Sequence, residues 1–312
     1  MLVHKEFHDN AVIDASSIIV DMSNNRKEGF VMENEGGFYG EINTNDQSLL
    51  VERRRRRRTE PEVMLAKARA TAERLEAALL RYPPDARLTR GMYCSFVDRR
   101  SDIEGQLVNP FAALLVQKVM GELLEAKLAQ ADNVFQRTFI DEKWDTTTVM
   151  WELPIRSIRQ TVQRAQAHLN GVFTVEFAVH LNWRSGPDGP RKVTPHAQGI
   201  FWGQETERQR RQAGERFQGG IDGAHGIMTV KEFYRPGMIA YAFKDPFIGY
   251  STYQRRDGTF ARQAGNLPGP EMSRTFKALR DLYWPDVIFA VGEQGKEVRD
   301  AFVKQWKARF RS

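Results

Sequence analysis

The sequence of 312 residues contains a single cysteine, Cys94. One cysteine excludes an internal disulfide and any multi-cysteine zinc site. No apolar run approaches the roughly 18 residues that span a bilayer. The N-terminal sequence MLVHKEFHDN lacks the basic region and hydrophobic core of a secretory signal. We therefore expect a reduced, cytoplasmic protein without a membrane segment.

Basic residues are in excess: 46 Lys and Arg face 40 Asp and Glu, for a formal net charge of +6. Such an excess favours a polyanionic partner such as nucleic acid, although a basic soluble protein without one would show the same charge. We predict that residues 1–59 form a flexible arm that binds DNA phosphates through counterion release, with a solvated linker as the alternative. The predicted phosphate contacts are six consecutive arginines: Arg53, Arg54, Arg55, Arg56, Arg57 and Arg58.

Residues 60–131 read as a helical N-terminal region. Apolar side chains recur at helical spacing after Pro61, and Pro83 and Pro84 end this first helix. A second amphipathic helix runs from about Pro110 to Ala131. These helices indicate packing, or a contact in a homo-oligomer, and carry no visible chemistry.

From residue 132 the pattern alternates between strands and helices. Residues 172–183 and 193–203 alternate in period two around a Gly- and Pro-rich turn, which predicts an antiparallel hairpin. The whole order is strand, helix, strand, strand, helix, strand, helix, with helix predicted over 153–171 and from Pro236 through Phe247. We therefore expect an α+β fold with an antiparallel sheet flanked by helices in residues 132–260, followed by a helical extension over 261–312.

The predicted hairpin gathers groups that could bind a metal ion. His196 and Gln198 are two residues apart on one strand and so share a face. A turn centred near Asp188 would place His180 opposite His196, with Glu176 further along the same face. Imidazole and oxygen ligands with open positions suit Mg or Mn in phosphoryl chemistry. The third protein ligand is either Glu176 or His180.

A nucleophile is expected downstream. Tyr241 lies on the predicted helix, with Lys244 three residues later on the same helical face, where its ammonium could orient a substrate phosphate or offset developing charge. Tyr250 and Tyr253 are alternatives, but neither is followed by a lysine at this spacing.

Two of these segments resemble known motifs. The segment TPHAQGIFWG resembles the second motif of HUH endonucleases, in the His-x-Gln version of rolling-circle replication initiators. Tyr241 to Lys244 is similar to the third motif, Tyr-x-x-Lys, and RTFIDEKW corresponds loosely to the first. The predicted strand order also resembles the RRM-like sheet of that family.

The resemblance implies a replication initiator that nicks and rejoins single-stranded or melted origin DNA of a plasmid or virus-like element. Tyr241 would form a 5'-phosphotyrosyl link, and His196 and Gln198 would hold Mg or Mn with a third ligand that is usually Glu in the viral initiators. The sequence has no Walker A motif, so we expect a host helicase as partner. A transposase or mobilisation relaxase would use the same chemistry, and a non-catalytic DNA-binding protein is the remaining alternative.

Overall fold

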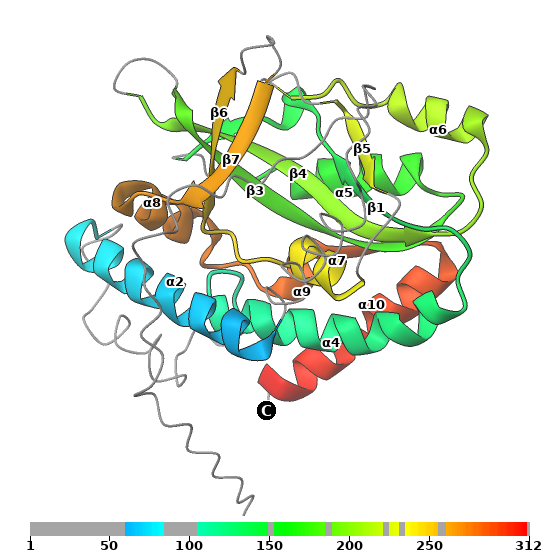
Figure 1. Cartoon of the computed structure of the whole chain (residues 1–312), viewed down its shortest axis with the longest axis horizontal. Helices are drawn as coiled ribbons and strands as arrows, with labels where there is room; N and C mark the ends of the chain where they lie inside the picture. The colour runs from blue at the N-terminus through cyan, green and yellow to red at the C-terminus, as the bar shows by residue number, and fades with distance from the viewer. Residues whose placement is uncertain are drawn as a thin grey trace, which may run out of the picture.

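The computed structural model describes residues 60–83, 105–148, 153–184, 189–220, 225–230, 235–254 and 260–310. The predicted basic arm, including Arg53–Arg58, lies outside these residues, and its role stays a prediction. The described part has an α+β fold with a mostly antiparallel sheet of eight strands (Figure 1). None of its helices is long and apolar enough to cross a membrane.

The predicted order of elements from residue 132 to the helix at 235 is confirmed, apart from a short 3-10 helix and a two-residue strand between the first strand and the first helix. The helices are α2 (Pro61–Arg81), α4 (Pro110–Ala129), the 3-10 helix η3 (Glu142–Trp144), α5 (Ile155–Ala165), α6 (Glu207–Gly214), α7 (Arg235–Ala242), α8 (Gly269–Leu279), α9 (Trp284–Val287) and α10 (Gly292–Phe310). The strands are β1 (Val134–Phe139), β2 (Thr146–Thr147), β3 (Asn170–Arg184), β4 (Arg191–Trp202), β5 (Ile227–Val230), β6 (Ile248–Gln254), β7 (Phe260–Asn266) and β8 (Ile288–Val291).

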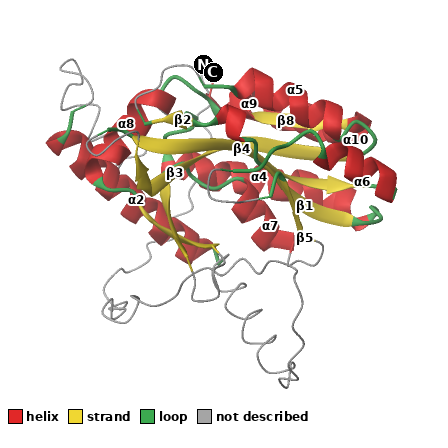
Figure 2. Ribbon diagram, turned by 90° about the horizontal axis from the view of Figure 1, so that it is seen from above, coloured by secondary structure: helices red, strands yellow, loops and turns green. Residues whose placement is uncertain are grey.

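Strands β3 and β4 form the centre of the sheet, whose main order is β5-β1-β4-β3-β6-β7. The short strand β2 pairs with β4, and β8 pairs with β3. All pairs are antiparallel except β3 with β6. Helix α5 lies on one face of the sheet, while α2, α4 and α7 lie on the other (Figure 2).

One continuous hydrophobic cluster joins the N-terminal helices, the sheet and the C-terminal helix. It includes Leu75 of α2, Met120 of α4, Phe173 and Phe201 of the central strands, and Phe302 of α10, all buried. The three predicted folded segments, 60–131, 132–260 and 261–312, therefore pack against one another in this structure. The division of the chain at these boundaries stays a prediction.

Three local predictions were wrong. The helix predicted from Pro236 through Phe247 begins at Arg235 and ends at Ala242. The helix predicted over 153–171 ends at Ala165, and Gly171 lies in β3 instead of ending the helix. A Cβ at Gly171 would overlap the ring of Phe201, so close strand packing is what requires glycine there. The segment 261–312, expected to be helical, also contributes two strands: most of β7, which pairs with β6, and β8, a four-residue apolar strand that pairs with β3.

Candidate active site

The ladder between β3 and β4 sets the site's geometry. Glu176 pairs directly with His196, and Thr174 pairs with Gln198. The predicted register, with His180 opposite His196, was therefore wrong. The cause is an irregularity in the pairing between Val179 and Arg184, which shifts the register on the turn side of the hairpin.

His180 enters a different hydrogen-bond chain. Its side chain is fully buried, and Nε2 lies 2.9 Å from Thr194 Oγ1. The Thr194 hydroxyl donates in turn to Asp145 Oδ1 at 2.8 Å, so it accepts from His180 Nε2–H. Of the two candidates for the third metal ligand, the structure places Glu176 against His196 and places His180 against Thr194.

The ring of His196 is oriented by its own strand. Its Nδ1 lies 3.1 Å from the backbone carbonyl oxygen of Thr194, which can only accept, so we assign the proton to Nδ1. The other nitrogen, Nε2, is 3.3 Å from Glu176 Oε2. A lone pair and a carboxylate oxygen repel at this distance unless a proton or a cation lies between them. This arrangement is the one that metal-binding histidines adopt.

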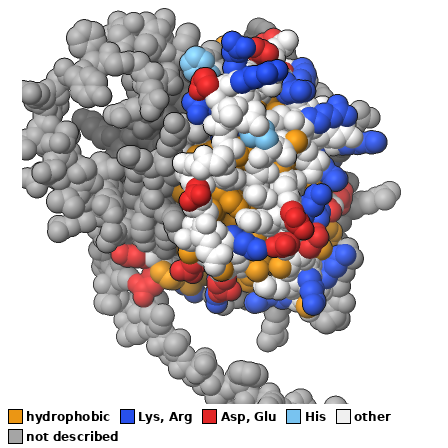
Figure 3. Space-filling model, turned by 90° about the vertical axis from the view of Figure 1, so that its right-hand side faces the viewer, with side chains coloured by type: hydrophobic (Ala, Val, Ile, Leu, Met, Phe, Trp, Pro, Cys, Tyr) orange, Lys and Arg blue, Asp and Glu red, His pale blue; other side chains and the backbone are white. Residues whose placement is uncertain are grey.

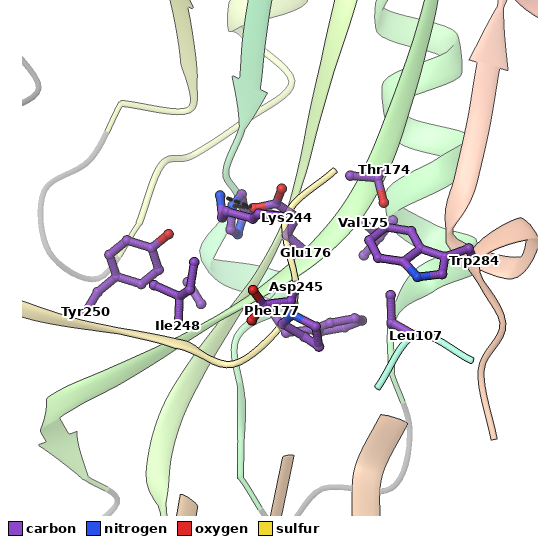
Figure 4. A pocket seen from close by; sticks show the side chains of 13 residues that line it. Leu107, Thr174, Val175, Glu176, Phe177, Lys244, Asp245, Ile248, Tyr250 and Trp284 are labelled. Carbon is purple, nitrogen blue, oxygen red and sulfur yellow. Dashed lines mark ion pairs between the residues drawn. The ribbon is translucent and has the colours of Figure 1, made fainter. Parts of the chain in front are cut away.

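Lys244 supplies a positive charge at this point. Its Nζ is 2.6 Å from Glu176 Oε2 (Figure 4). It also lies 3.4 Å from Gln198 Oε1 and 4.0 Å from the centre of the Tyr241 ring. Lys244 was expected on the helical face of Tyr241, but α7 ends at Ala242 and Lys244 lies in the turn that follows. The turn brings the ammonium back over the ring of Tyr241.

Burial and charge act against each other on this ion pair. Burial alone would raise the pKa of the Glu176 carboxyl, but the Lys244 ammonium and the His196 ring outweigh it and hold the pKa below its usual value. Burial would likewise lower the pKa of Lys244, and the Glu176 carboxylate raises it above the usual range. Both groups are therefore charged at neutral pH.

The three tyrosines occupy different environments. Tyr241 is half-buried beside Lys244. Tyr250, on β6, points toward Lys244 (Figure 4), and burial raises the pKa of its hydroxyl to about 12 against the opposing effect of the ammonium. Tyr253 is 47% exposed. Tyr241 and Tyr250 thus both belong to the site.

A small cavity adjoins these groups, with Glu176, His196, Lys244 and Tyr250 in its lining. Its volume of about 20 Å³ is enough for one water-sized sphere but not for a nucleotide. Glu176 Oε1 and Gln198 Nε2 are buried without a hydrogen-bond partner among the described residues. Glu176 lines the cavity, and an unsatisfied buried polar atom there indicates a polar occupant.

The donors present fit a hard divalent cation. The carboxylate of Glu176 lies against His196 Nε2, and the Lys244 ammonium contacts both this carboxylate and the amide oxygen of Gln198. A set of one imidazole nitrogen and two kinds of oxygen suits Mg or Mn. Within the described residues no group of three His, Cys, Asp or Glu side chains could hold a metal ion. Gln198 Oε1 is the oxygen donor that stands beside His196 and Glu176 in this set.

Sequence reasoning missed two residues that support the site. Thr194 lies two positions before His196 on the same face of β4, so the period of two could have indicated it. Gln117 of α4 donates to backbone carbonyls at the end of α7, and no local sequence signal marks it.

No protein-family model, curated protein or solved structure matches the chain.

Proposed function

We propose that the chain is an HUH-type DNA nicking and rejoining enzyme that initiates rolling-circle replication. The observation that carries the proposal is the meeting of five side chains from three elements. Strand β3 supplies Glu176, β4 supplies His196 and Gln198, and α7 with the loop that follows it supplies Tyr241 and Lys244. Residues 176, 196–198 and 241–244, which are separated in the sequence, thereby form one polar cluster beside the hydrophobic core.

The topology of the sheet supports the proposal. The segment β1-α5-β3-β4-α6-β5 has its four strands in the spatial order β5-β1-β4-β3, all antiparallel. This is the split β-α-β arrangement on which an RRM-like sheet is built. His196 and Gln198 lie on β4, one of the two inner strands of these four.

In the proposed reaction the Tyr241 hydroxyl oxygen attacks a DNA phosphorus. A bond forms between phosphorus and the tyrosine oxygen, and the bond between phosphorus and the 3' oxygen breaks. The phenol proton passes to a proton acceptor, and the 3' oxygen takes up a proton. The Lys244 ammonium, 4.0 Å from the Tyr241 ring, offsets the negative charge that develops there. Rejoining is the reverse attack by a 3' hydroxyl.

Glu176, His196 and Gln198 are the residues that would hold Mg or Mn. When bound, the ion would supply Lewis-acid polarisation of the phosphodiester. The Lys244 ammonium contacts both Glu176 and Gln198, so ammonium and metal compete for the same oxygen atoms.

The described surface on the α6 side also carries charged side chains (Figure 3). Lys and Arg side chains there are interspersed with Asp and Glu (Figure 3). Arg210 and Arg211 of α6 pair with Glu207 and Glu215. This mixture of signs is typical of a solvated surface.

The proposal is tested by incubating the purified chain with Mn and a pool of fluorescent single-stranded oligonucleotides. We expect an adduct that resists SDS and maps to Tyr241 by mass spectrometry. Tyr241→Phe should abolish the adduct, and the matched control Tyr253→Phe should retain it. Retained binding without any adduct, across many oligonucleotide sequences, would favour a DNA-binding protein. An adduct that persists in Tyr241→Phe would remove Tyr241 from the nucleophile role.

A further inference from the structure

A side chain from the N-terminal helical region reaches the end of α7. Nε2 of Gln117, on α4, donates to Phe243 O at 2.9 Å and to Ala240 O at 3.3 Å. These carbonyl groups belong to the residues immediately before Lys244 and immediately before Tyr241. A single amide group therefore holds the backbone at both ends of the segment that carries the two functional side chains.

The two acceptors are groups that need such a donor. The last carbonyls of a helix have no partner within the helix, and α7 is only eight residues long. The orientation of the Gln117 amide is also determined, because a flipped amide would place Oε1 against two carbonyl oxygens. Gln117 thus restrains a turn that would otherwise fray.

Packing alone does not explain a glutamine at this position. Its Oε1 is buried with no hydrogen-bond partner among the described residues, which is unfavourable. An apolar side chain of similar length would fill the same space without that cost. Gln117 also shares a helical face with Gly121, whose Cβ position is 3.9 Å from Ile239 Cδ1, so this face of α4 lies against α7 (Figure 1).

We propose that Gln117 is a positioning residue that holds Tyr241 and Lys244 in register with Glu176. The effect on DNA nicking rests on the proposed function, whereas the local restraint does not. The helical region 60–131 would then have a role beyond packing, because α4 forms part of the frame of the active site.

The restraint is tested by hydrogen exchange with mass spectrometry on the full chain. Gln117→Met removes the donors and keeps the length of the side chain. We expect amides of residues 240–247 to exchange about tenfold faster, with the rest of the chain unchanged. Gln163→Met is the matched control, because Gln163 Nε2 makes the same kind of bond from α5 to Ala290 O at 2.9 Å. The control should leave residues 240–247 unaffected.

The catalytic consequence is tested by the rate of adduct formation. In Gln117→Met the rate at saturating oligonucleotide should fall about ten- to a hundredfold, because small displacements of reacting groups are costly. The oligonucleotide concentration for half-maximal rate should not change. Gln117→His, which keeps a ring N–H donor, should recover part of the rate, and Gln163→Met should keep the wild-type rate.

Three results would overturn the positioning role. The first is unchanged exchange at 240–247 in a folded Gln117→Met chain. The second is a normal adduct rate despite faster exchange. The third is global unfolding of Gln117→Met, since the bond would then support the whole fold. A wild-type chain that forms no adduct would instead refute the proposed function, and hydrogen exchange would still decide whether Gln117 restrains the turn.

Discussion

Lys244 Nζ lies 2.6 Å from Glu176 Oε2 in the buried centre of the site, although one residue follows α7 and the other lies on β3. A buried carboxylate needs a positive partner, and its removal leaves an uncompensated charge. The same carboxylate is a proposed metal ligand. The negative charge of Glu176 can therefore be compensated either by Lys244 or by a bound metal cation. The first prediction tests whether the two replace each other.

Lys244→Met should strengthen metal binding while it weakens the metal-free fold. Without the ammonium, the oxygens of Glu176 and Gln198 become available to Mn, and we expect the dissociation constant of Mn to fall about tenfold or more. The free energy of unfolding without metal should drop by about 3 kcal/mol, as for other buried pairs that lose one partner. Electron paramagnetic resonance titration with Mn measures the first quantity and urea unfolding the second.

A matched control is available in Lys143, whose Nζ lies 2.6 Å from Asp141 Oδ2 but whose side chain is 49% exposed. Lys143→Met should leave Mn affinity unchanged. Unchanged or weaker Mn binding in Lys244→Met would show that the ammonium and the metal do not compete.

The third metal ligand gives a second prediction. His196→Ala and Glu176→Ala should each abolish measurable Mn binding, because each removes one of two metal-binding atoms that face each other. His180→Ala should keep Mn affinity and lower stability by about 1–3 kcal/mol, because it leaves the buried Thr194 hydroxyl without its donor. Isothermal titration calorimetry with Mn distinguishes loss of Mn binding from its retention. Equal loss of Mn binding in His180→Ala would make His180 the ligand instead.

The sequence predicted the parts of the fold that depend on local pattern. Period-two alternation over 172–183 and 193–203 gave the β3–β4 hairpin and placed Glu176, His196 and Gln198 on a common face. Only the family resemblance could pair Tyr241 and Lys244 with that face. Nothing in residues 203–240, between the hairpin and Tyr241, indicates how the chain returns to the sheet.

The features that sequence reasoning missed depend on distant contacts or on irregular geometry. The register irregularity between Val179 and Arg184 has no local signature, so counting from the turn gave the wrong partner for His196. The segment IFAV of β8 is too short to be distinguished from the helices on either side. Gln117 meets carbonyls 123 and 126 residues away, and only the folded chain brings them together.

A third prediction concerns the close approach of the two central strands. A Cβ at Gly199 of β4 would overlap Phe173 Cβ and Val172 O, which belong to the neighbouring strand β3 and cannot move independently of the sheet. Gly199→Ala should therefore lower the free energy of unfolding by about 3 kcal/mol or more. Gly214→Ala in α6 is the control, because nothing lies within 4 Å of its Cβ position. It should raise stability by up to about 1 kcal/mol. Equal stability of the two variants in urea unfolding would contradict the packing of β3 on β4.

The fourth prediction is a loss of stability at alkaline pH. Tyr250 has a pKa of about 12 in the folded chain, whereas an unfolded tyrosine ionises near pH ~10. A group whose pKa is raised by folding contributes stability below its unfolded pKa and loses that contribution as pH rises towards the folded value. Between these values the unfolded chain has released the proton and the folded chain still holds it, so stability should fall by about 1.4 kcal/mol per pH unit from this residue.

Lys244, whose pKa is also raised, acts in the same direction over the same range, so the tyrosine contribution must be isolated by substitution. Tyr250→Phe should flatten the decline in unfolding free energy, measured with urea as the pH is raised from just below to well above ~10, the ordinary pKa of tyrosine. The control Tyr253→Phe changes a tyrosine that is 47% exposed and should keep the wild-type slope. Identical slopes for all three proteins would mean that Tyr250 ionises as freely in the folded chain as in the unfolded one. The hydroxyl would then not be buried as it is in the structure.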